Sequence, residues 1–148
     1  MSLKSKLEDD MKDALRRKDD LRKNTLRLAL SAIRLAEIDK VSPLDEAGVI
    51  AVLQKEVKSR HETIADAEKA NRSDLIELAK KEIAILEGYL PKAFTPEELE
   101  AVARQAIADS GANSPAQIGQ VMKILMPRVQ GKATGEQASQ VVRKLLQG

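Results

Sequence analysis

The chain has 148 residues, of which 43% are hydrophobic and 32% charged, and its formal net charge is +2. This is the balance of a globular protein with one compact domain or two small ones, not of a disordered or fibrous chain. Cysteine is absent and Tyr89 and Phe94 are the only aromatic residues, which excludes disulfides and zinc–thiolate sites and argues against RNA-binding modules that stack bases on aromatic platforms.

Apolar residues recur at spacings of three and four along almost the whole chain, without a convincing alternating strand pattern, so the sequence predicts an all-α fold. In the first 90 residues we expect a four-helix hairpin array, with helices near 3–18, 21–39, 46–70 and 74–87. Polar or proline-containing turns separate these helices. Apolar side chains are expected to face inward on the first helix (Leu3, Leu7, Met11, Ala14, Leu15), the second (Leu21, Leu28, Ala32 and Leu35, with Leu26, Leu30 and Ile33 widening the stripe) and the fourth (Leu75, Leu78, Ala79, Ile83, Leu86).

The segment Gly88–Pro96 is predicted to join two lobes, an N-terminal helical domain of residues 1–90 and a C-terminal domain of residues 91–148. Thr95, Pro96 and Glu98 form a strong helix-start signal, with an N-cap, a first helical residue and a capping-box partner. The second lobe is expected to hold three short helices, at 96–110, from 114 to a stop at Pro127, and at 135–147. Tyr89 and Phe94, beside the joint, are candidates to pack the lobes together or stiffen the link.

Charge is distributed unevenly along the chain. Residues 1–90 carry 18 basic and 18 acidic side chains, whereas after Ser110 five basic residues face one acidic residue, Glu136. The far end of the chain is therefore mildly basic, which is weak evidence for nucleic-acid binding by itself.

Catalytic motifs are not found. His61 is the sole histidine, and Ala65 stands where the zinc-protease motif requires a second one. The run Gly131–Gly135 lacks two requirements of a phosphate-binding NTPase loop, because Met126 replaces a glycine and Ala133 replaces the serine or threonine. We therefore expect no catalytic residue, no metal and no cofactor.

A milder interpretation of Gly131–Gly135 is an anion site, where a basic loop leads into a helix N-terminus with free N–H groups. Arg128 and Lys132 flank this loop. In the alternative interpretation, the two glycines only serve turn geometry and Thr134 only caps the helix.

Several runs, taken in order, resemble the YqeY family: Leu53–Arg60, Asn71–Leu75, Glu87–Pro91, Ile118–Lys123 and Gly131–Gly135. The resemblance implies that the C-terminal lobe is similar to the tail domain of the B subunit (GatB) of glutamine-dependent aspartyl/glutamyl-tRNA amidotransferase. That tail is implicated in contacting tRNA and contains no catalytic residue. Two residues depart from the family pattern, Asn71 where glycine is usual and Gln120 where lysine is common.

The resemblance implies a non-catalytic tRNA-binding or amidotransferase-associated protein. The candidate RNA-binding residues are Lys123, Arg128, Lys132, Thr134, Arg143 and Lys144. Two alternatives remain, a protein-interaction adaptor without an RNA role and an accessory to carbon–nitrogen ligase activity with glutamine as amido-N donor. Expected partners are tRNA, amidotransferase subunits or another protein, with no DNA and no membrane. Because the N-terminus has no apolar signal core and no apolar run is long enough to span a bilayer, we expect a cytoplasmic location.

Overall fold

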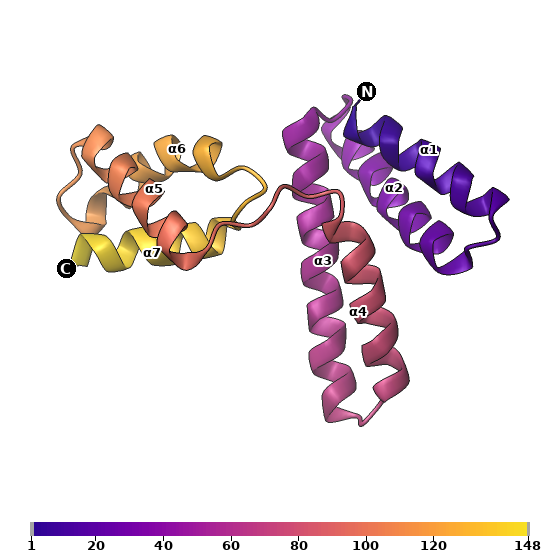
Figure 1. The fold of residues 1–148 in the computed structure, drawn as a ribbon. Helices are drawn as coiled ribbons and strands as arrows, with labels where there is room; N and C mark the ends of the chain where they lie inside the picture. Colours follow the sequence, from indigo (N-terminus) through magenta and orange to yellow (C-terminus); the bar gives the residue numbers. More distant parts are fainter. Residues whose placement is uncertain (1, 148) are drawn as a thin grey trace. The chain divides into compact units, whose positions relative to one another are not determined.

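The computed structural model describes residues 2–147, and these residues form α-helices and connecting turns without a β-strand. The chain divides into two compact units, Met1–Leu90 and Pro91–Gly148 (Figure 1). The first unit holds α1 (Leu3–Arg16), α2 (Asp20–Lys40), α3 (Glu46–Lys69) and α4 (Ser73–Glu87). The second holds α5 (Pro96–Ser110), a 3-10 turn (Pro115–Gln117), α6 (Ile118–Val129) and α7 (Gly135–Gln147). The prediction of an all-α fold with four and then three helices is confirmed.

Most helices begin at a residue whose side chain satisfies a free backbone N–H group. Asp19 accepts from Arg22 N at 3.1 Å to start α2, and Asp45 accepts from Gly48 N at 2.8 Å to start α3. Thr95 accepts from Glu98 N at 3.1 Å, as its helix-start signal predicts. These starts are set by local sequence, because an N-cap needs only the residue itself and the next helical turn.

The first three helices end alike, with a residue other than glycine in the left-handed region. Lys18 has φ 58°, Val41 has φ 57° and Asn71 has φ 54°. After each one, the next N–H bonds a carbonyl five residues back, as Ser42 N does to Glu37 O at 3.2 Å. This is the Schellman arrangement, which usually uses glycine at the left-handed position. The departure from the family pattern at Asn71 thus falls where asparagine is the next most tolerant residue.

The first unit consists of two helical hairpins, α1 with α2 and α3 with α4, which pack together mainly through α2 (Figure 1). No helix among the described residues is long and apolar enough to cross a membrane. The fully buried core side chains come from all four helices: Leu7, Leu26, Ala29, Ile33, Val49, Leu53 and Leu86.

The predicted inward faces are partly wrong in this unit. On α2, the predicted inward residues Leu26 and Ile33 are fully buried, together with Ala29, but Leu28 is 52% exposed and Leu35 is 63% exposed. Leu15 on α1, and Leu75 and Leu78 on α4, are likewise exposed. Because α2 carries leucines around much of its circumference, its periodicity does not decide the buried side; the positions of α1, α3 and α4 do.

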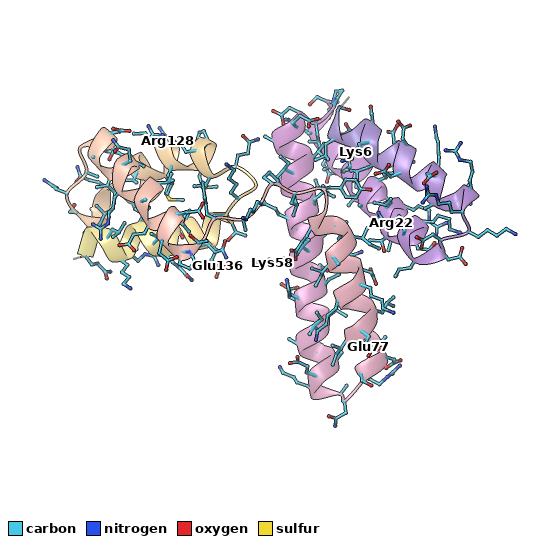
Figure 2. The ribbon with its side chains drawn as sticks, viewed as in Figure 1. Lys6, Arg22, Lys58, Glu77, Arg128 and Glu136 are labelled. Carbon is cyan, nitrogen blue, oxygen red and sulfur yellow. The ribbon has the colours of Figure 1, made fainter. Side chains whose placement is uncertain are left out.

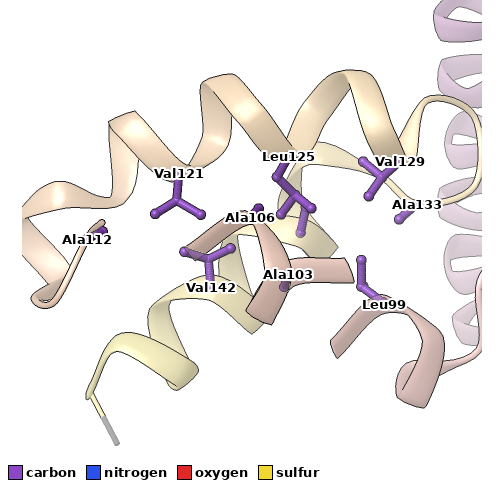
Figure 3. Packing of buried hydrophobic residues seen from close by; sticks show 10 residues of the cluster. Leu99, Ala103, Ala106, Ala112, Val121, Leu125, Val129, Ala133 and Val142 are labelled. Atoms are coloured by element: carbon purple, nitrogen blue, oxygen red, sulfur yellow. The ribbon is translucent and has the colours of Figure 1, made fainter. Parts of the chain in front are cut away.

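The second unit closes a small core of its own (Figure 3). Val121, Leu125 and Val129 on α6 point towards α5 and α7 and are fully buried, as is Val142 on α7. The prediction that Pro127 stops α6 is wrong, since the helix continues to Val129. Proline removes one hydrogen bond near the helix end, and the burial of Val129 favours one more half-turn.

Candidate nucleic-acid interface

Five of the six candidate RNA-binding residues are exposed cations, and three of them lack the contacts that hold Arg128 and Lys132. Lys123 lies on α6, and Arg143 and Lys144 lie on α7. None of the three makes an ion pair with another residue in the range 2–147. Their charges are therefore accessible to a phosphate without the prior loss of an internal contact.

Arg128, by contrast, already has a carboxylate partner. Its Nη2 lies 2.7 Å from Asp109 Oδ2, so α6 is tied to the end of α5, and Figure 2 shows the position of Arg128 on the second unit. Gln105 Nε2 donates to the other oxygen of Asp109 at 2.9 Å. The hydrogen bonds from Arg128 and then Gln105 lower the pKa of Asp109. A phosphate at Arg128 would have to compete with this carboxylate.

Lys132 is held at both its backbone and its side chain by Phe94. The Phe94 N–H donates to the Lys132 carbonyl at 2.9 Å, and the Lys132 Nζ lies 5.1 Å from the centroid of the Phe94 ring. The cation–π contact leaves the charge in place, because the ring carries no counter-charge. Lys132 is exposed and stays available to an anion.

Thr134 caps α7 through a reciprocal pair of hydrogen bonds. Its Oγ1 accepts from Gln137 N at 3.1 Å, and its own N–H donates to Gln137 Oε1 at 3.1 Å. Gly131, at the start of the loop, has φ 76°, a conformation that favours glycine. Glu136 adds an acidic side chain in the first turn. These contacts favour the turn-and-cap interpretation of this loop over the anion site.

The six candidates do not converge on one pocket. Lys123 and Arg128 are five residues apart on α6, so their side chains point about 140° apart around the helix axis. Arg143 and Lys144 follow the start of α7 by about 12 Å at the usual helical rise. Lys144 also lines a shallow groove with Glu100, Arg104 and the apolar residues Pro96, Val141 and Leu145. The arrangement is a dispersed basic surface, which suits backbone contacts more than recognition of a base.

A charged cluster that the sequence did not predict lies in the first unit. Arg60 is only 9% exposed and contacts Glu56 and Glu82, at 2.8 and 2.9 Å. The spacing of Glu56 and Arg60, four residues apart on α3, was the available signal. His61, next to this arginine, is exposed, and within 2–147 the structure places no three His, Asp or Glu side chains together as metal ligands.

Comparisons with known proteins place nearly the whole chain in one family. The family described as Yqey-like protein matches residues 4–146. Altered inheritance of mitochondria protein 41, mitochondrial, of Kluyveromyces lactis is 41% identical over 113 residues, which cover 74% of this chain and 60% of the relative. The proteins of that name from Lachancea thermotolerans and Pyrenophora tritici-repentis are 40% and 27% identical, over 64% and 96% of this chain and 51% and 77% of theirs. The chain thus spans between half and two thirds of the first two relatives.

The names of these relatives correct the predicted location. They are named as mitochondrial proteins, which points to mitochondria and contradicts the cytoplasmic location. The composition of a folded domain could not decide this, because mitochondrial addressing is carried by Arg-rich amphipathic transit segments. Over residues 4–146, this chain belongs to the family of YqeY-like proteins.

Proposed function

We propose that this protein is a non-catalytic tRNA-binding protein whose second unit contacts the RNA backbone. The observation that carries the proposal is a set of exposed cations that have neither an ion pair nor a ring contact with any residue from 2 to 147, namely Lys123, Arg143 and Lys144. They lie in a region where Glu136 is the sole acidic residue after Ser110. The resemblance of this unit to the tail domain of the amidotransferase B subunit supports the same choice of ligand.

The chemistry of these residues suits phosphate and sugar contacts. Such contacts position a nucleic acid without reading its sequence, and each neutralised phosphate releases counterions. The same resemblance supports an association with amidotransferase subunits, in which this chain presents RNA and the partner performs the carbon–nitrogen ligation. The proposal gives this chain no chemical step.

The test is binding of unmodified tRNA by the full chain, measured between 50 and 200 mM salt. The variant Arg143→Glu/Lys144→Glu is compared with Lys12→Glu/Lys55→Glu, which changes exposed lysines of the first unit and alters the net charge equally. We expect the first variant to bind about tenfold or more weakly, with a salt slope lower by about two, and the second to bind like the wild type.

A second pair of substitutions, Lys132→Glu and Arg128→Glu, tests the basic loop. We expect Lys132→Glu to weaken binding more, because Arg128 is already paired with Asp109. Failure of the wild-type chain to bind tRNA at 50 mM salt would refute the proposal. Equal losses in the second-unit variant and its first-unit control would refute it as well, by showing that only net charge matters.

A further inference from the structure

A groove in the first unit combines an apolar rim with a charged floor. It has a volume of about 350 Å³ and lies between α2, α3 and α4. Leu28 from α2 and Leu75 and Leu78 from α4 line it, and these side chains are 52%, 38% and 45% exposed. Soluble proteins rarely expose a contiguous group of large apolar side chains unless that surface binds something. The three leucines around this groove are therefore a candidate binding surface.

Exposed apolar side chains are concentrated in this unit. Every large apolar side chain that is exposed in residues 2–147 belongs to it: Leu15, Leu28, Leu35, Ile38, Val41, Leu75 and Leu78. Leu35 lies two helical turns after Leu28, and Ile38 one turn further, so the apolar strip of α2 extends from the groove for about 15 Å. A strip of this length matches the contact face of a helix of about three turns.

The floor of the groove carries more negative than positive charge. Arg60 Nη1 contacts Glu56 Oε2 at 2.8 Å and Arg60 Nε contacts Glu82 Oε2 at 2.9 Å. One guanidinium therefore faces two carboxylates. The side chains of Glu56 and Glu82 keep 22% and 18% of their surface exposed, and both line the groove. The excess negative charge lies at the base of the leucine rim.

We propose that this groove binds an amphipathic helical segment of a partner protein, with an apolar face flanked by lysine or arginine. Leucine-like side chains of the partner pack between Leu28 and the α4 leucines, and its cation pairs with Glu56 or Glu82. Helix-in-groove recognition uses this combination of apolar anchors at i, i+3 or i+4 and i+7 with flanking charges. The acidic floor disfavours nucleic acid and anionic lipid, since both carry phosphate.

The test uses a designed 18-residue amphipathic peptide with leucines at helical spacing and lysines beside them. Its matched control has glutamates in place of the lysines. Binding to the full chain is measured by fluorescence anisotropy. We expect the lysine peptide to bind at least tenfold more tightly than the glutamate peptide, and Glu56→Gln to reduce that preference severalfold.

Two variants locate the contact. Leu28→Gln/Leu78→Gln changes the rim, and Leu15→Gln/Val41→Gln changes exposed apolar residues that do not line the groove. Only the first is expected to lose peptide binding, by at least tenfold, while circular dichroism and tRNA binding stay as in the wild type. Retained tRNA binding separates this inference from the function proposed for the second unit.

Three results would overturn the inference. The first is equal affinity for the lysine and glutamate peptides, or no binding of either. The second is an equal loss of peptide binding in the two double variants. The third is a concentration-dependent dimer in sedimentation that Leu28→Gln/Leu78→Gln abolishes, because a second copy of the chain would then occupy the groove.

Discussion

The Tyr89 hydroxyl donates to Asp10 Oδ2 at 2.6 Å, which joins the residues after α4 to α1 across 79 positions of sequence. The Lys6 Nζ lies 5.6 Å from the centroid of the same ring, and Figure 2 labels Lys6 on this hairpin. Tyr89 is thus bound within the first unit, and Phe94 is bound to Lys132 within the second. Each aromatic residue of the joint has a partner in its own unit.

The first prediction concerns the ionisation of Tyr89. Its burial and then its hydrogen bond to Asp10 raise its pKa to about 12, from a usual value of 10.0. Because Tyr89 is the sole tyrosine and there is no tryptophan, phenolate absorbance reports this group directly. We expect the absorbance titration of the folded protein to have a midpoint near 12, and Asp10→Asn to lower it.

The same shift makes stability depend on pH at the alkaline end. Since the folded pKa is above the unfolded one, the contribution is complete below about pH 10 and is lost as pH rises towards 12. We expect the free energy of unfolding to fall more steeply over this range in the wild type than in Tyr89→Phe. If the free energy of unfolding falls with pH equally in the wild type and in Tyr89→Phe, the titration of lysines alone explains the loss of stability.

The second prediction concerns the charged cluster beneath the groove. Arg60→Met removes the cation that pairs with Glu56 and Glu82, and both of these carboxylates are largely buried. We expect it to lower the free energy of unfolding by about 3 kcal/mol, measured by urea denaturation. Arg72→Met is the control, because the Arg72–Asp74 pair is more than half exposed and its loss should cost much less stability than the loss of Arg60. Comparable costs for the two variants would contradict the buried role of Arg60.

The third prediction concerns backbone strain at the end of α2. Val41 has φ 57° although it is β-branched, and its side chain is 88% exposed, so little packing compensates. Val41→Asn should raise the free energy of unfolding by about 1 kcal/mol, because asparagine tolerates the left-handed region better. Asn71→Val should lower it by a similar amount, since Asn71 has φ 54°. Thermal unfolding followed by circular dichroism checks both; changes of the same sign would contradict the strain argument.

The fourth prediction uses the Arg128–Asp109 ion pair to test whether RNA reaches α6. Asp109→Asn removes the carboxylate that lies 2.7 Å from Arg128. We expect tRNA affinity to rise severalfold and the salt slope to increase by about one phosphate contact. Asp66→Asn, an exposed residue of the first unit, makes the same change in net charge. If Asp109→Asn and Asp66→Asn increase tRNA affinity equally, Arg128 does not contact the RNA directly.

Local signals in the sequence predicted the helices well. Thr95 and Thr134 are the caps that the sequence analysis names, and they, like Asp19 and Asp45, each accept a backbone hydrogen bond at a helix start. Gly111, in the left-handed region with φ 72°, ends α5. These features depend on interactions within one or two turns, so a short stretch of chain contains the information they need.

The sequence by itself therefore determined the all-α class, the order of the helices and nearly all their starting points. Only the tertiary structure decided that Leu28 and Leu78 face solvent, that Arg60 is buried between two glutamates and that Arg128 is paired with Asp109. The physical reason is that helical periodicity gives the angular position of a side chain on its own helix, whereas burial and pairing depend on which other helix lies opposite. Those neighbours are distant in sequence, and no local pattern encodes them.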